Sequence, residues 1–402
     1  MNSSAIVLAK RVLRPVRDAV KNKFIEFKLH NRIEGRWLED VEYFDFNVFK
    51  KQVLRFLKSV RVSNDTYLYK YSKSCSKPTL YASAYACMTI SLLGEMGRLA
   101  ASEKKNWRNY FDAFQSEEDG LFYDPIVEGI AYNDTDWWGS RHLALHMISA
   151  YSSLGFRPKY KFLFLNEYYG KSAIQKWLGN FDWGSSEIGL SDIDNKIMNI
   201  GCLLQYQRDA WSDTQASFAL EELKRYLKSV VNPKTGMWGE FDEKDPNQRS
   251  RMIQFAYHLF PLFFYDGDYN FDAQNITKFA LDTQNKYGGY GVKPNSSACE
   301  DIDSIDILIR FYKYCSVDNR LKIDDSLRKA LKWVLLNQMK DGGFVFKLYE
   351  PFVFGNIETS SARNMSAMLP TWFRTLSVAY MSRHLKIKQD FKLSRCPGYE
   401  FL

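Results

Sequence analysis

The sequence carries one acidic cluster whose spacing suits proton transfer, CEDIDSIDILIRFYKYC at residues 299–315. Asp303, Asp306 and Arg310 stand at positions i, i+3 and i+7, so they share one side of a helix. Isoleucines occupy another side, so one face should pack and the other should meet solvent or a cavity. Two close carboxylates in a cavity raise the pKa of one of them and keep a proton available for general acid catalysis. Asp303 is therefore the candidate acid, with Asp301 and Asp306 as candidate catalytic partners.

The same cluster also has a structural interpretation. A carboxylate in the first turn of a helix is stabilised as the anion by the helix dipole, so Asp301 would serve as a capping residue. Asp306 and Arg310 are one turn apart and would form an ion pair. The sequence leaves catalysis and structure open as alternatives for these residues.

A second candidate site lies in NDTDWWGSRHLALH, residues 133–146. His142 and His146 are one turn apart, a spacing that suits a metal ion, with Asp134 or Asp136 as a third ligand. The alternative is a hydrogen-bonding histidine pair that faces a cavity. Because no Glu stands between the histidines as in HExxH, we assign no metal here. The further candidate substrate-binding residues around this pair are Trp137, Trp138, Asp136 and His258.

Arg363, Trp372 and Arg374 form a third group, in SARNMSAMLPTWFRTL. Two guanidinium groups and an aromatic ring could hold a phosphate, diphosphate or carboxylate. The alternative is a helix kinked at Pro370 and packed by Trp372. No GxGxxG, P-loop or GxSxG motif accompanies these residues, and the cofactor stays unknown.

The net charge is concentrated at the start of the chain. Of a formal +8, residues 1–36 contribute about +6, from nine Lys and Arg against three Asp and Glu. The remaining body is nearly neutral, which argues against nucleic acid as a partner. The N-terminal segment is predicted as a basic amphipathic helix, which would bind an anionic membrane surface or pack against the body. Its apolar stripe consists of Leu8, Val12, Val16, Val20, Phe24 and Phe27.

The six cysteines form no CxxC pair and indicate a reducing compartment. The short apolar stretch AIVLA does not make a signal peptide, and no stretch reaches the roughly 18 apolar residues of a membrane span. These features predict a cytoplasmic protein, with peripheral binding to the inner membrane face as the open alternative.

The elements that must position these residues follow a repeat. Glycines flanked by aromatic residues recur at Gly120, Gly184, Gly236, Gly288 and Gly342, with spacings of 64, 52, 52 and 54 residues. An apolar helix is predicted after each turn and a more amphipathic helix before each of the last three. Helical hairpins of this size bury both faces when they close into a ring. We therefore predict an all-α fold, an α/α toroid in one domain over residues 37–402, after the N-terminal segment 1–36.

In such a ring, all glycine turns and all starts of inner helices should lie at one end. The sequence places most candidate residues at these positions. The predicted rim consists of Asp134, Asp136, Trp137, Trp138, Arg141, His142, Asp192, Asp194, Arg249, Arg251, Glu300, Asp301, Asp303, Arg363 and Asn364.

The chain resembles the terpenoid cyclase and protein prenyltransferase superfamily of α/α toroids. LDTQNKYGGYG and LLNQMKDGGFVF are similar to its repeats of glutamine followed by glycine and an aromatic residue. DIDSIDILIR resembles the Asp-x-Asp-Asp motif of class II cyclases, with Asp301 and Asp303 at the first two aspartates and Ser304 at the last. The resemblance implies that Asp303 protonates an alkene or epoxide.

Three functions stay open at this stage. The first is acid catalysis on a prenyl or polyprenyl substrate, with Trp137, Trp138 and Trp372 stabilising positive charge. The second is a carbohydrate-active toroid, a hydrolase or lyase, in which Asp136 or His142 assists Asp303. A looser resemblance to proteins from bacterial surface-polysaccharide gene clusters implies that such an enzyme would be linked to surface polysaccharide. The third is a non-catalytic binding protein at the membrane surface. The expected partner is thus a small-molecule or lipid-linked substrate.

Overall fold

The computed structural model describes residues 20–33, 44–63, 67–129, 132, 135–242 and 244–399. Residues 20–33 are helical, in agreement with the helix predicted for the N-terminal segment. Residues 1–19 of that segment, and Asp134 as an alternative metal ligand, lie outside the described residues.

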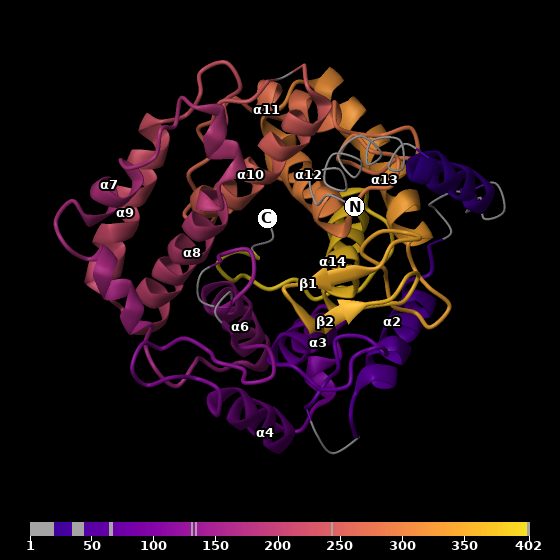
Figure 1. The fold of residues 1–402 in the computed structure, drawn as a ribbon, viewed down its shortest axis with the longest axis horizontal. Coiled ribbons are helices and arrows are strands. Elements are labelled where there is room, and N and C mark those ends of the chain that lie inside the picture. Colours follow the sequence, from indigo (N-terminus) through magenta and orange to yellow (C-terminus); the bar gives the residue numbers. More distant parts are fainter. Residues whose placement is uncertain are drawn as a thin grey trace, which may run out of the picture.

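In the described chain, six helices form a closed inner ring (Figure 1). Each packs against the next one in the chain, and the last also packs against the first, which closes the ring. Most of their side chains are buried, because each helix touches two ring neighbours as well as an outer layer. The ring consists of α3 (Leu80–Leu92), α6 (Ser140–Leu154), α8 (Ile193–Trp211), α10 (Pro246–Tyr265), α12 (Ala298–Phe311) and α14 (Met368–His384).

A second layer of helices surrounds the ring, and each of them precedes an inner helix in the chain (Figure 1). These helices are amphipathic: in the first, Val53 and Phe56 are buried while Lys51 and Lys58 are exposed. The predicted α/α toroid is therefore confirmed. The outer helices are α2 (Phe46–Val60), α4 (Ala101–Asp112), the short α7 (Ala173–Leu178), α9 (Thr214–Ser229), α11 (Ala273–Leu281) and α13 (Val317–Leu336).

The predicted glycine turns join outer to inner helices at one end of the ring. Gly120, Gly236, Gly288 and Gly342 have φ values between +72° and +97°, which favour glycine. Gly184 does not share this conformation. Its connection is built instead from the short α7 and the 3₁₀ turns η3 (Leu163–Tyr168) and η4 (Ser186–Leu190).

The glutamines of the repeat stabilise three of these turns. Each side-chain amide donates a hydrogen bond to a glycine carbonyl within the turn and so satisfies an acceptor that has no partner in a helix. The spacing of glutamine and glycine is thus explained by the fold. The three pairs are Gln115 with Gly120, Gln284 with Gly288 and Gln338 with Gly342, each at 2.9 Å.

A small antiparallel hairpin, which the sequence reasoning missed, follows the last glycine turn. It consists of β1 (Phe352–Phe354) and β2 (Asn356–Ser361), with Gly355 at the tip. The other short elements are the 3₁₀ turns η2 (Met96–Arg98) and η5 (Tyr312–Tyr314). None of the described helices combines the length and the apolar composition needed to cross a lipid bilayer.

The C-terminal segment closes the other end of the ring. The Lys392 amide donates to the carbonyl of Leu92, the last residue of α3, at 2.8 Å. Arg395 donates to the carbonyl of Tyr265, the last residue of α10, at 2.5 Å. The Cys396 thiol lies 3.3 Å from the Ser149 hydroxyl, further along the ring axis. Beyond it the chain turns into the ring, where Gly398 and Tyr399 reach the central cavity.

Candidate functional site

The ring encloses a cavity of about 440 Å³, within the range of roughly 300–1,000 Å³ typical of small-molecule sites. Five inner helices line it, mainly with their N-terminal halves, and the β-hairpin and the turn η4 complete the wall. All inner helices begin at the end of the ring that carries the glycine turns, so the cavity belongs to that end. Gly398 and Tyr399 of the C-terminal segment contribute to its lining from the opposite side.

Apolar and aromatic side chains make up most of the cavity wall. The polar lining residues include Asp303, His258, Arg251, His142 and His146, and Ser191, Asp192, Asn195 and Gln254 add further polar groups. A largely apolar substrate with a polar part would match such a wall. The apolar and aromatic lining residues are Trp137, Leu145, Leu190, Met198, Tyr257, Phe346, Phe352, Val353, Phe354, Leu369, Phe373 and Tyr399.

Asp303 lies in the second turn of α12 and lines the cavity, with only 3% of its surface exposed. Its carboxyl forms no hydrogen bond with any residue that the structure describes. Burial, followed by repulsion from Glu300, raises its pKa well above the usual value, although Arg251 attracts the anion. The carboxyl therefore keeps its proton at pH values where an ordinary aspartate is ionised.

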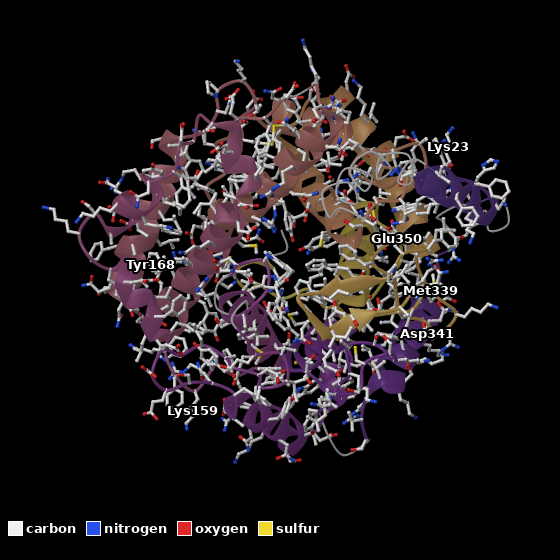
Figure 2. The ribbon with its side chains drawn as sticks, in the orientation of Figure 1. Lys23, Lys159, Tyr168, Met339, Asp341 and Glu350 are labelled. Carbon is white, nitrogen blue, oxygen red and sulfur yellow. The ribbon has the colours of Figure 1, made fainter. Side chains whose placement is uncertain are left out.

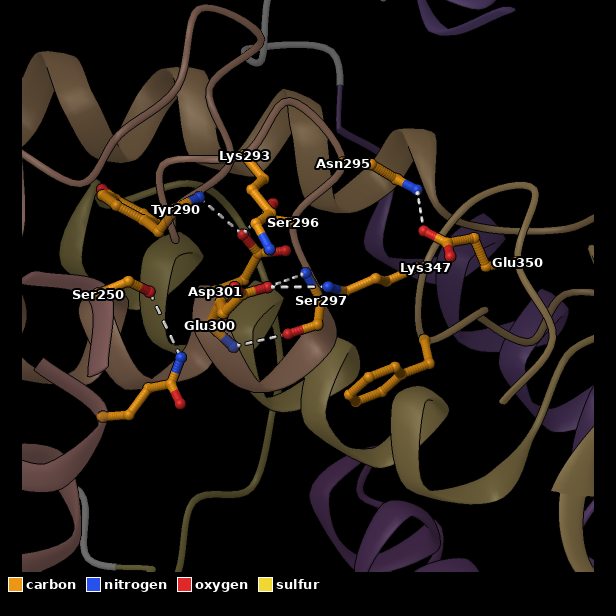
Figure 3. Close-up of polar contacts among 12 residues, drawn as sticks. Ser250, Tyr290, Lys293, Asn295, Ser296, Ser297, Glu300, Asp301, Lys347 and Glu350 are labelled. Carbon is orange, nitrogen blue, oxygen red and sulfur yellow. Dashed lines mark hydrogen bonds and ion pairs between the residues drawn. The ribbon is translucent and has the colours of Figure 1, made fainter. Parts of the chain in front are cut away.

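Asp301 stands two residues before Asp303 on α12. It is fully buried and does not line the cavity. Figure 3 shows its carboxylate among polar groups, where it accepts from the Tyr290 amide at 2.9 Å and the Ser296 hydroxyl at 2.8 Å. Trp333 donates at 3.0 Å and Arg374 forms an ion pair at 2.7 Å. These contacts join α12 to α13 and α14, so Asp301 has a structural role.

The capping role expected of Asp301 belongs to other residues. Ser297 is the N-cap of α12, and its hydroxyl accepts from the Glu300 amide at 3.1 Å. The Glu300 carboxylate accepts from the Ser297 amide at 2.7 Å, which completes a capping box. The helix begins at Ala298, so Ser297 and Glu300 occupy the capping positions and Asp301 follows them.

Asp306 forms the ion pair with Arg310 that the spacing indicates, on the buried side of α12. Both side chains are almost fully buried, and neither lines the cavity. Of the three aspartates in the motif, Asp303 alone combines a place in the cavity wall with a carboxyl that no cation pairs.

A second polar unit comes from α8 and from α10, the ring neighbour of the helix that carries Asp303. The His258 Nδ1 atom lies 2.7 Å from Asp194 Oδ2, and the Arg251 guanidinium binds both oxygens of Asp194 at 2.8 Å. Burial alone would raise the pKa of Asp194, but the hydrogen bonds and charges of His258 and Arg251 lower it to about 2. Asp194 is thus an anion that holds the Nδ1 proton of His258, which leaves Nε2 as the free nitrogen.

The sequence analysis placed Asp194 and Arg251 at the rim but did not assign them to the site. Asp194 is separated by 64 residues from His258, so only ring closure brings them together. The signal in the sequence was the position of Asp194 and Arg251, since each lies at or near the start of an inner helix.

A chain of hydrogen bonds crosses the cavity floor. The Tyr81 hydroxyl donates to the Gly139 carbonyl at 2.9 Å, so His142 Nδ1 at 3.0 Å is the donor to Tyr81. His142 Nε2 then accepts from His146 Nε2 at 3.2 Å, and His146 Nδ1 accepts from the Tyr399 hydroxyl at 2.9 Å. We assign these tautomers from the direction of the hydrogen bonds.

Both histidines of this chain are neutral near pH 7. Burial, then the repulsion that a protonated His258 would exert, lowers the pKa of His142 to about 3. Burial, then His142, lowers the pKa of His146 well below its usual value. Their ring nitrogens bind each other and two tyrosines, so the hydrogen-bonded arrangement is the one observed. Among the described residues, no group of three or more His, Cys, Asp or Glu side chains is placed to hold a metal ion.

The remaining predicted residues lie at varied distances from the cavity. Trp137 lines it and is 39% exposed. Asp136 is buried behind the wall in a bidentate ion pair with Arg141 at 2.7 and 2.9 Å. Arg363 is exposed on the segment before α14. The structure therefore brings Asp303, Trp137 and the three histidines together at one cavity, whereas Asp136, Trp138, Arg363, Trp372 and Arg374 do not line it.

No family model matches the sequence, and no curated protein is significantly similar to it. Among solved structures, the chain is similar to the GH76 α-mannanase BT2949 of Bacteroides thetaiotaomicron, at 12% identity and a TM-score of 0.42, covering 85% of this chain and 95% of that one. It is also similar to the type II terpene cyclase MstE from Scytonema, at 10% identity and a TM-score of 0.45, covering 85% and 99%. A polysaccharide lyase matches at 10% identity and a TM-score of 0.47, covering 85% and 98%.

Proposed function

We propose that this protein is an acid catalyst that protonates a double bond of a prenyl or polyprenyl substrate inside the toroid. The observation that carries the proposal is Asp303: a buried carboxyl in the cavity wall that no described cation or hydrogen-bond donor pairs, with a raised pKa. An alkene is a weak base, so its protonation needs a neutral acid held in a dry, apolar site.

The walls support the charge that protonation creates. Transfer of the Asp303 proton to one alkene carbon forms a C–H bond from the π electrons and leaves a cation on the neighbouring carbon. The faces of Trp137, Phe354 and Tyr257 can stabilise that cation through their ring quadrupoles. A second double bond then attacks the cation and forms a C–C bond, which moves the positive charge along the substrate.

The reaction ends with loss of a proton beside the final cation, which forms a new double bond. His258 is the base that we assign, because Asp194 holds its Nδ1 proton and leaves Nε2 free to accept. The product is an isomer of the substrate, since one proton is added and one is lost. Before the next turnover, His258 releases the proton it accepted to solvent, and Asp303 takes one up from solvent.

Deuterium incorporation tests this assignment. The protein would be incubated in D₂O with acyclic prenyl alcohols and polyprenyl phosphates, and the products analysed by mass spectrometry and NMR. We expect a product that carries one deuterium, at the carbon that receives the Asp303 proton. The Asp303→Asn variant should be slower by about 10²–10⁴-fold, while Asp325→Asn, a change on the exposed face of α13, should react normally.

Turnover without deuterium incorporation would contradict the proposal, and so would full activity of the Asp303→Asn variant. If none of the prenyl compounds binds or reacts, the substrate class is wrong. Binding can be followed independently by quenching of the fluorescence of Trp137, which lies in the cavity wall.

A second candidate is a carbohydrate lyase or hydrolase, favoured by the pair Asp194 and His258. An imidazole oriented by a carboxylate is a common general base, and it could remove a proton from a sugar ring or from water. Asp136 is not available as the second carboxylate of a glycosidase, because Arg141 pairs it behind the wall. Incubation with a panel of acidic and neutral polysaccharides separates the candidates. New reducing ends or unsaturated sugars that depend on His258 but not on Asp303 would favour this second function.

A further inference from the structure

The described N-terminal helix, residues 20–33, has two apolar faces. One packs on the toroid, with Ile25 and Leu29 buried. The other consists of Val20, Phe24 and Phe27, which are 64%, 54% and 63% exposed. These three residues belong to the stripe identified in the sequence, and the structure turns them away from the body.

Polar contacts fix the orientation of this helix. Lys21 forms an ion pair with Glu350 at 2.6 Å. At the other end of the helix, the Arg32 guanidinium donates to the Leu336 carbonyl at 2.8 and 3.1 Å. Both ends of the helix thus contact the toroid while its second apolar face points to solvent.

The helix is also basic, with four Lys and Arg against one Glu between residues 20 and 33. The Lys28 ammonium lies over the Phe24 ring, 4.3 Å from its centroid, so a cation borders the apolar face directly. Apolar rings flanked by lysines are the composition of helices that lie in the plane of a bilayer surface. Each basic residue near an anionic bilayer adds about 1 kcal/mol of attraction.

The exposed face lies at the same end of the toroid as the cavity. Glu350, which holds the helix, stands two residues before β1, and Leu336 ends α13 just before the last glycine turn. Figure 2 shows Lys23 on the N-terminal helix at the outer edge of the ring, and Glu350 between this helix and the hairpin. The hairpin itself presents Val353 at 58% exposure and Ile357 at 72% exposure, and Val353 also lines the cavity.

We propose that this end of the toroid binds the surface of an anionic lipid bilayer through a docking surface formed by Val20, Phe24, Phe27, Val353 and Ile357. The lysines of the helix contact the headgroups, and the apolar side chains enter the boundary of the acyl chains. The cavity wall then continues into the membrane through Val353, so a lipid-borne substrate reaches Asp303 without crossing water. This last step rests on the proposed function, whereas the binding itself does not.

Vesicle flotation of the full chain tests the docking surface. Wild type is expected to float with vesicles that contain phosphatidylglycerol, to float less with pure phosphatidylcholine, and to dissociate as salt rises. The double variant Phe24→Ser/Phe27→Ser should bind at least about tenfold more weakly. The matched control is Phe218→Ser on α9, since Phe218 is 65% exposed on the other side of the ring.

Equal flotation of wild type and the double variant would overturn the proposal, as would the absence of flotation. Vesicle binding that appears only after deletion of residues 1–19 would show that this segment covers the docking surface in the full chain. A concentration-dependent dimer that the double variant abolishes, without vesicle binding, would identify a second copy as the occupant. Asp303→Asn should float like wild type, so a failure of the proposed chemistry is distinguishable from a failure of docking.

Discussion

Replacing Asp303 by Asn is expected to stabilise the folded protein at neutral and alkaline pH. The wild-type carboxyl is 3% exposed and has no hydrogen-bonding partner among the described residues, so its ionisation within the fold is costly. Asparagine has nearly the same shape and carries no charge, which removes this cost. When a side chain of the same shape but without the charge stabilises the fold, the original residue serves chemistry and not folding.

The sign and size follow from proton linkage. The unfolded chain releases the Asp303 proton near the ordinary pKa of 3.8, whereas the folded protein holds it to higher pH. Between these values the folded state binds more protons, so wild-type stability falls by about 1.4 kcal/mol for each pH unit. The variant lacks this loss. The difference in unfolding free energy between variant and wild type should therefore grow with pH, up to the pKa of folded Asp303.

Urea denaturation of both proteins from about pH 5 to pH 8 measures this difference. Asp301→Asn is the matched control on the same helix. It should lose roughly 3–5 kcal/mol, because it leaves the buried Arg374 without its anionic partner. A pH-independent difference for Asp303→Asn, or destabilisation as large as that of Asp301→Asn, would refute the reasoning.

Two further predictions concern the turns and the histidine chain. Gly342→Ala should destabilise by more than about 2 kcal/mol, because φ is +97° and the new Cβ would lie 1.9 Å from a backbone oxygen. Gly184→Ala should stay within about 0.5 kcal/mol, and equal denaturation midpoints for the two variants would contradict this. As pH falls below about 6.5, His142 and His146 should each lower the free energy of unfolding by about 1.4 kcal/mol per pH unit. The reason is that these histidines take up protons in the unfolded chain while they stay neutral in the fold. His146→Gln should reduce the steepness of acid unfolding, and an unchanged slope would count against the buried pair.

The ring architecture was readable from the sequence because its signals are local. A glycine that needs positive φ, a glutamine a few residues before it and an apolar helix after it are all short-range features, and they recur with the period of one hairpin. The ion pair of Asp306 with Arg310 is local as well, because one helical turn brings the two side chains together.

The composition of the site was only partly readable. The hairpin at residues 352–361 was missed, although Phe-Val-Phe-Gly-Asn-Ile contains the aromatic and β-branched residues and the glycine of a short turn. The contribution of Tyr399 carries no signal of its own. It depends on how the C-terminal segment closes the ring, 253 residues away from its partner His146.

Helix periodicity and turn chemistry act over a few residues, so the helical hairpins, their order and the end of the ring that carries the candidate residues follow from the sequence. Which of the three aspartates on α12 faces the cavity follows from the folded arrangement of the helices. That choice depends on which side of the helix meets Arg374 and which meets the open centre. The curvature of the ring and the partners from distant helices set both, so Asp301 became a buried ion pair while Asp303 kept its proton.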